Sequence, residues 1–509
     1  MLDRVPPAGI SRRALLRSAL AAGVAAGAAG LPAASATRFP EGGLTGPKVA
    51  RLGDSITQFA EYARIGGPAR LSRRARGAMT WVKTLFPAFN DDTWHDPEDL
   101  RQGRCMRGSN NGIAGDHLGY LSPENPGTLL RWDQEVAPMR PEVVLLSVGT
   151  NDLNSFIPAS AVRRDLGHQI AAITATGAIP IVTTVRPRGA LGRAAWAMPD
   201  QASDSRYAAR REVNDWLRAQ ASGRVLVADV NAYLEDPDSR AGAGGDWLPD
   251  LTPVDGVHPG TPAAWAEARA LLPILRTLIA DDNVYGTDPL APGNLLPNGA
   301  FTGTSGLIGW GVEGHCASGW AIARKSGDAR MRASTTTEDG VAKQVLQITP
   351  GHHDTTFILR TDPALLPLTD LGDAAWLRFH LHQEVSAHPG WLSYNPRLLL
   401  SAGGQNWTLL AGALETGPGE FLPAAAWSGW PATHPVRRQP GDVAVSCSVA
   451  ITVAGGVPGT PTLRFSRAQL REVPDPRPAW NVAASGVSHQ AEPFLPFPAI
   501  ESPASGDLS

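Results

Sequence analysis

Two short segments about 200 residues apart carry the side chains that nucleophilic ester cleavage requires. They read Gly53-Asp54-Ser55-Ile56-Thr57 and Asp255-Gly256-Val257-His258-Pro259. A serine hydroxyl is a weak nucleophile at neutral pH, so it needs a base within hydrogen-bond reach and an acid that fixes the tautomer of that base. We therefore predict a catalytic triad in which Ser55 is the nucleophile, His258 the base and Asp255 the orienting acid.

Two residues between these segments suit an oxyanion hole. Gly115 has no side chain, so its backbone N–H can approach a developing oxyanion, and Asn151 offers an amide donor whose charge does not change. We predict that both act together with the N–H of Ser55. Taken singly, these residues have plainer interpretations, as a helix N-cap serine, a turn glycine and a turn-forming asparagine. Their joint occurrence in this order favours the site.

The base is chosen from twelve histidines. His258 stands out because it follows an acidic residue by three positions, in a turn where both side chains could face one pocket. His117 is the alternative, since it lies two residues past Gly115. No group of histidine and acidic residues has the spacing of a metal site, so we expect neither a metal nor a cofactor.

The pattern from Pro47 to about Ala280 alternates buried strands with helices. A three-layer α/β domain follows from this alternation, with functional residues at the carboxyl ends of parallel strands. We expect Ser55 and Asn151 at such ends. The predicted strands are 48–52, 143–148, 181–185 and 225–230, and the predicted helices are 161–176, 207–221 and 263–279, the last with Thr261 as N-cap.

The stretch from Gly66 to Gly108 is an irregular insertion in this domain. It is interpreted either as a lobe that shapes the substrate site or as an insertion with a structural role alone.

The composition changes after a linker over residues 281–293. From 294 to 473, short runs rich in Thr, Val, Leu and Trp are separated by Gly, Pro and Asp, which is typical of an all-β sandwich. Cys316 and Cys447 lie in this region and could pair, whereas Cys105 is expected to be a single buried thiol. The Pro/Ala/Ser-rich tail, 474–509, is expected to be loosely packed.

The N-terminus is predicted to be a targeting segment over residues 1–36. Ser11-Arg12-Arg13-Ala14-Leu15-Leu16-Arg17 resembles a twin-arginine signal, and an Ala-rich stretch and Ala34-Ser35-Ala36 follow it. We expect a periplasmic or extracellular protein without stable membrane insertion. The formal net charge of -3 argues against nucleic acid as a partner. The oligomeric state cannot be inferred.

Residues 47–280 resemble the SGNH (GDSL) hydrolase family, in the four blocks 53–57, 111–116, 149–152 and 255–258. This resemblance implies a flavodoxin-like fold for the domain 37–280 and the same roles for Ser55, Gly115, Asn151, Asp255 and His258. Ile56 replaces the leucine of the family motif, and the 66–108 insertion is longer than in compact members. The opening residues 294–301, with Gly309-Trp310 shortly after, resemble the first strand of jelly-roll carbohydrate-binding modules of the galactose-binding-like type. The closing residues 463–473 resemble the last strand of such modules.

These features favour an exported serine esterase that acts through an acyl-enzyme and removes short acyl groups, acetyl in particular, from carbohydrate. The sandwich tryptophans could stack on sugar rings or form the sandwich core. They are Trp310, Trp320, Trp376, Trp391, Trp407, Trp427 and Trp430. One alternative is a lipid or small-ester hydrolase. Another, from a different class, is a glycan-binding protein without catalysis, against which the five site residues argue.

Overall fold

The computed structural model describes residues 48–59, 62–64, 70–89, 109–122, 125–189, 205–239, 244–253, 255–281, 285, 288–361, 368, 371–372, 375–402, 408–415, 421–438 and 442–474. The predicted signal segment, Cys105, the side chain of Trp407 and all of the tail beyond Pro474 lie outside these residues. Among the helices of the described residues, none is both long and apolar enough to cross a membrane.

A five-stranded parallel sheet forms the centre of the first half of the chain. Counting only the strands of this sheet, the spatial order is 2-1-3-4-5 in chain order, which is the flavodoxin-like arrangement, and every neighbouring pair is parallel. The predicted α/β fold is thus confirmed. From one edge the strands are β4 (Asn110–Gly112), β1 (Val49–Gly53), β5 (Val143–Ser147), β6 (Ile179–Thr183) and β7 (Leu226–Ala228).

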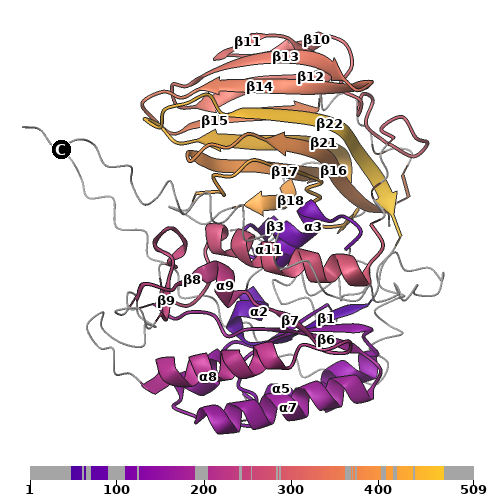
Figure 1. The fold of residues 1–509 in the computed structure, drawn as a ribbon. Helices are drawn as coiled ribbons and strands as arrows, with labels where there is room; N and C mark the ends of the chain where they lie inside the picture. The colour runs from indigo at the N-terminus through magenta and orange to yellow at the C-terminus, as the bar shows by residue number, and fades with distance from the viewer. Residues whose placement is uncertain are drawn as a thin grey trace, which may run out of the picture. The chain divides into compact units, whose positions relative to one another are not determined.

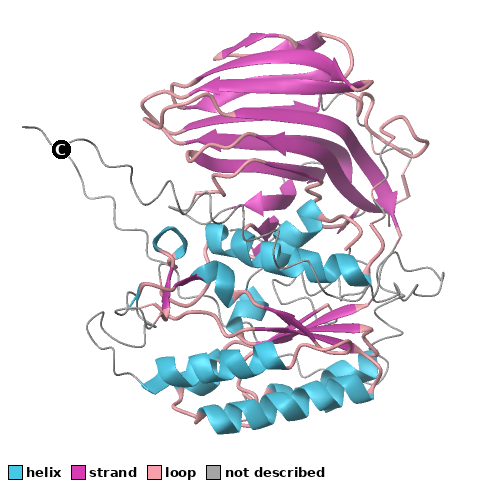
Figure 2. Ribbon diagram, in the orientation of Figure 1, coloured by secondary structure: helices cyan, strands magenta, loops and turns pink. Residues whose placement is uncertain are grey.

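Helices cover both faces of this sheet and make the domain three-layered (Figures 1 and 2). Helices α7 (Ala159–Ala175) and α8 (Ser205–Ala219) lie on one face, and α3 (Ala78–Leu85) and α11 (Thr261–Leu278) lie on the other. All residues of β1 and β5 are buried, as expected for strands covered on both faces. Shorter elements complete the domain: α2 (Ser55–Phe59), α5 (Thr128–Arg131), η1 (Trp132–Val136), η2 (Ala137–Met139), α6 (Thr150–Asn154), α9 (Asn231–Leu234), β8 (Glu235–Asp236), β9 (Asp246–Trp247) and η3 (Pro249–Leu251).

The three predicted helices are confirmed to within two residues, but the predicted N-cap of the last one is wrong. Gly260 is the N-cap of α11, and Thr261 is its first helical residue. The extended backbone of Gly260 and the proline at the second helical position start this helix without a side-chain cap.

Two antiparallel-rich sheets form the predicted sandwich. The order of the first is β10-β12-β15-β21-β17-β18-β3-β2, and that of the second is β11-β13-β14-β22-β16-β19, with β20 on β16. The strands after the linker are β10 (Ser305–Ile308), β11 (Val312–Gly314), β12 (Cys316–Ser326), β13 (Arg330–Glu338), β14 (Val341–Thr349), β15 (Thr355–Thr361), β16 (Trp376–Val385), β17 (Trp391–Ala402), β18 (Thr408–Glu415), β19 (Trp427–Gly429), β20 (Val436–Arg437), β21 (Asp442–Val453) and β22 (Thr462–Val473).

Two strands of the first sandwich sheet come from the other half of the chain. They are β2 (Tyr62–Arg64) and β3 (Arg70–Arg74), and β3 pairs in parallel with β18. The predicted boundary at residue 280 therefore does not divide the strands cleanly, because the segment after α2 belongs to the sandwich sheet.

The strand expected at the start of the sandwich is not formed. Residues 294–301 form turns and no strand, and Asn294 holds them by accepting from the N–H groups of Leu296 and Leu470. Cys316 and Cys447, for which a disulfide was left open, are both buried free thiols.

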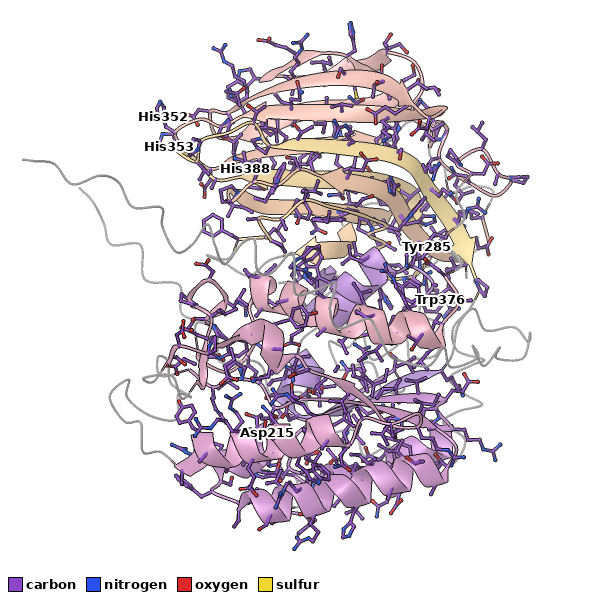
Figure 3. The ribbon with its side chains drawn as sticks, viewed as in Figure 1. Asp215, Tyr285, His352, His353, Trp376 and His388 are labelled. Atoms are coloured by element: carbon purple, nitrogen blue, oxygen red, sulfur yellow. The ribbon has the colours of Figure 1, made fainter. Side chains whose placement is uncertain are left out.

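The predicted linker is in part ordered against the sandwich. Tyr285 is buried against the second sandwich sheet (Figure 3), where its ring lies 4.8 Å from that of His380. His380 Nε2 also bonds to the carbonyl oxygen of Tyr285 at 3.1 Å. The linker therefore continues the packing of the sandwich.

Candidate active site

Ser55 lies at the carboxyl end of β1, near the middle of the parallel sheet. Asp54 follows the strand, and its Oδ1 accepts from the N–H of Ile56 at 2.9 Å, which turns the chain into α2. Gly53 is required before this turn, because a Cβ there would lie 2.5 Å from the carbonyl oxygen of Ser147 on the neighbouring strand. The local sequence thus presents the Ser55 hydroxyl at the sheet edge where functional residues of α/β folds lie.

His258 and Asp255 lie in the loop that leads into α11 and meet Ser55 there. His258 Nε2 is 2.8 Å from Ser55 Oγ, and His258 Nδ1 is 2.6 Å from Asp255 Oδ2. The other oxygen of Asp255 accepts from the N–H groups of Val257 and His258, both at 2.9 Å. These bonds fix both ends of the loop relative to each other, so the three predicted residues form one hydrogen-bonded row.

The charge of Asp255 determines the tautomer of His258. Burial alone would raise the pKa of Asp255, but the hydrogen bond and charge of His258, with two backbone N–H groups, lower it to about 2. An ionised carboxylate can only accept, so Nδ1 carries the proton. In the neutral imidazole Nε2 is then an acceptor, and Ser55 donates its hydroxyl proton to it.

Gly115 and Asn151 lie on loops that end at the same edge of the sheet. Gly115 follows β4, which pairs with β1 up to Gly53, and its φ of +79° favours glycine. Asn151 lies in the first turn of α6 after β5, the other neighbour of β1. Asn151 Nδ2 donates to the carbonyl oxygen of Asp116 at 3.0 Å, which joins the two loops. The structure therefore brings both predicted oxyanion residues to the edge that carries Ser55.

The alternative base, His117, has a different partner. Its Nε2 is 3.0 Å from Ser155 Oγ, and its ring is buried. This contact joins the Gly115 loop to the end of α6, so His117 supports the loops.

Two buried carboxylates hold the loops. Asp54 caps the turn before α2, and Asp152 accepts from the N–H of Leu118 at 3.1 and 3.3 Å. Burial raises the pKa of Asp54 to about 6, against the lowering effects of the Ile56 N–H, Arg186 and His258. Burial likewise raises the pKa of Asp152 to about 6.

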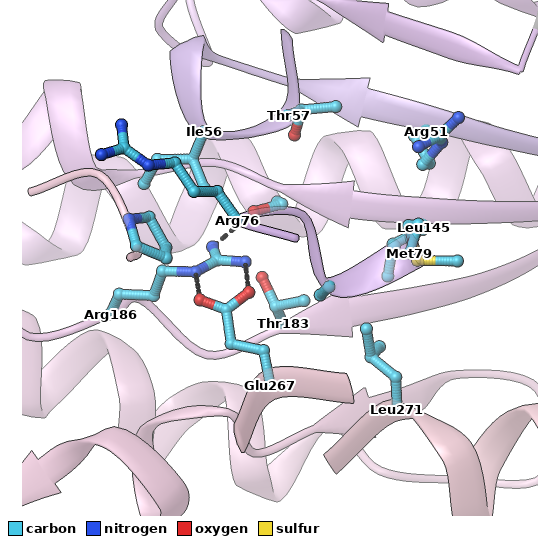
Figure 4. Close-up of a pocket in the computed structure, with 13 residues that line it drawn as sticks. Arg51, Ile56, Thr57, Arg76, Met79, Leu145, Thr183, Arg186, Glu267 and Leu271 are labelled. Atoms are coloured by element: carbon cyan, nitrogen blue, oxygen red, sulfur yellow. Dashed lines mark hydrogen bonds and ion pairs between the residues drawn. The ribbon is translucent and has the colours of Figure 1, made fainter. Parts of the chain in front are cut away.

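A buried ion pair between the segment after β6 and α11 was not predicted from the sequence. Arg186 donates to both carboxylate oxygens of Glu267, at 2.5 and 2.7 Å, and its third nitrogen donates to Ser147 Oγ at 2.7 Å (Figure 4). The pair links the ends of β5 and β6 to α11. Its signals in the sequence were an arginine directly after an apolar strand and a single glutamate within an apolar helix.

A second arginine after β6 also lies at this edge. Arg188 is buried, and its Nη1 donates to the carbonyl oxygen of Thr150 at 3.2 Å, next to Asn151. Burial lowers the pKa of Arg188 to about 10, while Asp54 and Asp255 act in the opposite direction. Its positive charge therefore balances carboxylates on both sides of Ser55.

A small cavity of about 40 Å³ lies behind α2. Its walls are formed by residues next to Ser55 and His258 (Ile56, Thr57 and Pro259), by α3 and by the Arg186–Glu267 pair (Figure 4). Within the described part of the chain, no group of three or more His, Cys, Asp or Glu side chains could hold a metal ion.

Comparison with known proteins identifies the first half of the chain. Residues 52–266 match the GDSL-like lipase/acylhydrolase family. This part of the chain is a GDSL-type acylhydrolase domain. The acylhydrolase domain makes the protein a carboxylic ester hydrolase. Its match includes Ser55, Gly115, Asn151, Asp255 and His258 and omits most of β1 and most of α11.

The chain is also similar in part to solved structures. One is a lipolytic protein of the G-D-S-L family from Desulfitobacterium hafniense, with 16% identity, a TM-score of 0.29, and coverage of 45% of this chain and 99% of that one. Another is an acetyl xylan esterase, with 18% identity, a TM-score of 0.30, and coverage of 45% and 98%. A third, from carbohydrate-binding modules of the beta-sandwich superfamily, has 9% identity, a TM-score of 0.22, and coverage of 30% and 57%. No curated protein sequence matches the chain.

Proposed function

We propose that the protein is an exported serine esterase that removes short acyl groups, acetyl in particular, from carbohydrate. The observation that carries the catalytic part of this proposal is the row Ser55–His258–Asp255, with donor–acceptor distances of 2.8 and 2.6 Å. A serine, a neutral imidazole and an ionised carboxylate at these distances are the groups that acyl transfer to water requires.

The proposed reaction has two steps. Ser55 Oγ attacks the ester carbonyl while its proton passes to His258 Nε2, and the imidazolium is stabilised by Asp255. The tetrahedral intermediate collapses when His258 returns the proton to the leaving alcohol, which leaves an acyl-enzyme. Water then attacks the acyl carbon, again with His258 as base, and the acid is released.

The oxyanion of each tetrahedral intermediate would be bound by three donors. They are the N–H groups of Ser55 and Gly115 and the side-chain amide of Asn151. One N–H of that amide donates to the carbonyl oxygen of Asp116, which orients the group, and the other is available for the oxyanion. A donor held in advance costs little reorganisation when the charge develops.

Among the sandwich tryptophans that the structure describes, burial leaves one for the proposed carbohydrate contact. Five of the seven candidates are buried and form core or interface: Trp320, Trp376, Trp391, Trp427 and Trp430. Trp310 is 68% exposed, and the Arg324 guanidinium lies 3.7 Å from its ring centroid. Trp310 is therefore the residue that we propose to stack on a sugar ring, with the sandwich tethering the esterase to its polymer.

A lipid or longer-chain ester is the second candidate substrate. The loops after Gly115 and Asn151 expose large apolar side chains, namely Tyr120, Leu121 and Phe156. Such side chains close to an esterase site suit a long acyl chain as well as a sugar ring. The preference for acyl length distinguishes the two.

The test is hydrolysis of p-nitrophenyl esters from acetate to palmitate, by the mature protein and by Ser55→Ala. We expect kcat/KM to be highest on acetate, to fall steeply with chain length and to vanish in the variant. Acetylated polysaccharides are then tested with Trp310→Ala, which should raise KM on the polymer alone. A preference for long chains would favour lipid esters, and no turnover of any ester would favour a glycan-binding protein.

Export is proposed from the predicted signal segment. Expression of the full chain in a bacterium with twin-arginine export should yield a shortened protein outside the cytoplasm, starting near Thr37. Replacement of Arg12 and Arg13 by lysine should retain it in the cytoplasm at full length. Export of the lysine variant would contradict the twin-arginine assignment.

A further inference from the structure

The insertion between the Ser55 segment and the Gly115 loop connects the acylhydrolase domain to the sandwich. Its described part comprises β3 and α3. The strand extends the first sandwich sheet by pairing with β18, and the helix contacts β19 of the second sheet. One continuous apolar core includes buried residues of α3, α11 and both sandwich sheets. The two halves of the chain therefore share a core.

A row of aromatic side chains crosses this junction. Trp81 of α3 is fully buried, and its ring meets Trp265 of α11 edge to face at 4.9 Å and Trp427 of β19 edge to face at 5.8 Å. Trp427 Nε1 in turn donates to the hydroxyl of Tyr394 within the sandwich at 3.1 Å. Edge-to-face pairs of this kind have defined geometry as well as apolar contact. The row therefore fixes the orientation of α3.

The backbones of α3 and the sandwich also touch. The N–H of Trp430 donates to the carbonyl oxygen of Thr84, in the last turn of α3, at 2.7 Å. Gly429 makes this approach feasible, because a Cβ there would lie 2.4 Å from the same oxygen. The obstacle is backbone, so a larger residue at 429 must displace α3 or β19.

The first turn of α3 lies next to the catalytic segments. Ala78 and Met79 line the small cavity together with Ile56 and Thr57, which follow Ser55, and with Pro259, which follows His258. Trp265, at the near end of the row, lies in the second turn of α11, directly after the His258 loop. Displacement of α3 would thus shift the segments that carry Ser55 and His258, the two partners of the catalytic hydrogen bond.

We infer that the sandwich positions the ester-hydrolysing site, with Trp427 as its principal positioning residue acting through α3. This role rests on the triad proposed above, and it is separate from any tethering to carbohydrate. A tether changes the local concentration of a polymer and leaves a small soluble ester unaffected. A positioning contact changes the rate of the chemical step itself, because small misplacements of reacting groups are costly.

The test uses the full chain and p-nitrophenyl acetate, which contains no sugar. The variants are Gly429→Ala, Trp427→Ala and the conservative Trp427→Phe. Gly372→Ala is the matched glycine control, since a Cβ at 372 meets nothing within 4 Å. Rates are normalised to active sites titrated with a nitrophenyl phosphonate, and folding is checked by circular dichroism.

We expect Gly429→Ala and Trp427→Ala to lower kcat by about 10-fold, with KM within about twofold of wild type, and Trp427→Phe to restore most of the rate. The Gly372→Ala control should retain wild-type kcat. If the folded variants keep wild-type kcat per titrated site, the inference is wrong, even where they melt earlier. If Trp427→Ala does not fold, the kcat of Gly429→Ala decides the test. Undiminished turnover in Ser55→Ala would instead overturn the proposed function.

Discussion

The two halves of the molecule each contain a serine hydroxyl bonded to a histidine, and only one of these pairs has the surroundings of an active site. In the acylhydrolase domain, Ser55 Oγ lies 2.8 Å from His258 Nε2. In the sandwich, Ser428 Oγ lies 2.9 Å from His382 Nε2. Distance alone does not distinguish them, so the difference must lie in the groups around each pair.

The third group is the first difference. His258 Nδ1 contacts the Asp255 carboxylate at 2.6 Å, whereas His382 Nδ1 contacts the hydroxyl of Ser466 at 3.2 Å. The carboxylate of Glu384 lies 3.9 Å from His382 Nδ1, and its Oε1 is already paired with Lys343 Nζ at 2.6 Å. Burial lowers the pKa of His382, and the positive charges of Arg467 and Lys343 lower it further, against Glu384. An imidazolium is therefore disfavoured there, which makes His382 a poorer acceptor for a proton from Ser428.

The second difference is the backbone that presents the serine. Ser55 follows a parallel strand at an edge where two further loops supply donors, while Ser428 lies within β19, a strand paired to β16. A strand residue presents its side chain to one face of a sheet and gathers no converging loops. A serine–histidine contact therefore forms an active site only where a carboxylate and oxyanion donors surround it.

The largest expected effect on kcat comes from replacing the serine of each pair. Ser55→Ala should lower kcat on p-nitrophenyl acetate by about 10⁴-fold or more, because the nucleophile is lost. Ser428→Ala should leave kcat unchanged. A fluorophosphonate probe that labels active serines should label the wild type and Ser428→Ala and should not label Ser55→Ala. Labelling that persists in Ser55→Ala and disappears in Ser428→Ala would reverse the assignment.

The next largest effect on kcat comes from replacing the carboxylate near each histidine. Asp255→Asn should lower kcat by about 10⁴-fold, since an amide at this position no longer enforces the tautomer with Nδ1 protonated or stabilises the imidazolium. Glu384→Gln, the matched change near His382, should have no effect on kcat. Steady-state kinetics on p-nitrophenyl acetate measure both. A loss below about 10-fold in Asp255→Asn would mean that His258 is oriented by another group.

A smaller effect on kcat tests the oxyanion donor that the loop after β5 supplies. Asn151→Ala should lower kcat by roughly 10²- to 10³-fold, the usual scale for one oxyanion donor. Asn154→Ala is the matched control, because it lies in the same short helix and outside the proposed oxyanion hole. Near-wild-type turnover in Asn151→Ala would remove this amide from the oxyanion hole.

Much of the acylhydrolase half could be predicted from the sequence, because local patterns determine it. Runs such as Val143–Val148 can only be buried strands, and the order of strands and helices leaves few topologies for a parallel sheet. Ser55, Gly115, Asn151, Asp255 and His258 occur in short motifs, each directly after a strand or before a helix. Their convergence follows from the geometry of a parallel sheet.

The junction with the sandwich could not be predicted, because it depends on contacts between distant segments. Trp81 sits in an irregular insertion, and nothing near it indicates Trp427 as its neighbour, 346 positions further along by residue number. The pairing of β3 with β18 is likewise a contact across the chain. Arg186 and Glu267 each had a local signal, but their pairing depends on how α11 packs on the sheet.

The smallest predicted effect concerns stability, and here the two halves should respond to pH in opposite directions. Burial raises the pKa of Asp54 to about 6 from an ordinary value of 3.8, so between about pH 4 and 6 the folded state holds more protons than the unfolded chain. This group therefore makes the protein less stable as pH rises through that window. Burial lowers the pKa of His380 to about 3 from 6.5, so there the unfolded chain holds more protons. His380 makes the protein more stable as pH rises through the same window.

Single variants separate these opposing contributions. Asp54→Asn removes the first, so the free energy of unfolding should rise more steeply from pH 4.5 to 6.5 than in the wild type. His380→Gln removes the second and should make the slope shallower or negative. Each change is at most about 1.4 kcal/mol per pH unit, the limit for one proton. Urea unfolding at pH 4.5, 5.5 and 6.5 measures the slopes. Equal slopes in all three proteins would mean that these groups titrate normally in the folded state, and that burial at both places is relieved by water.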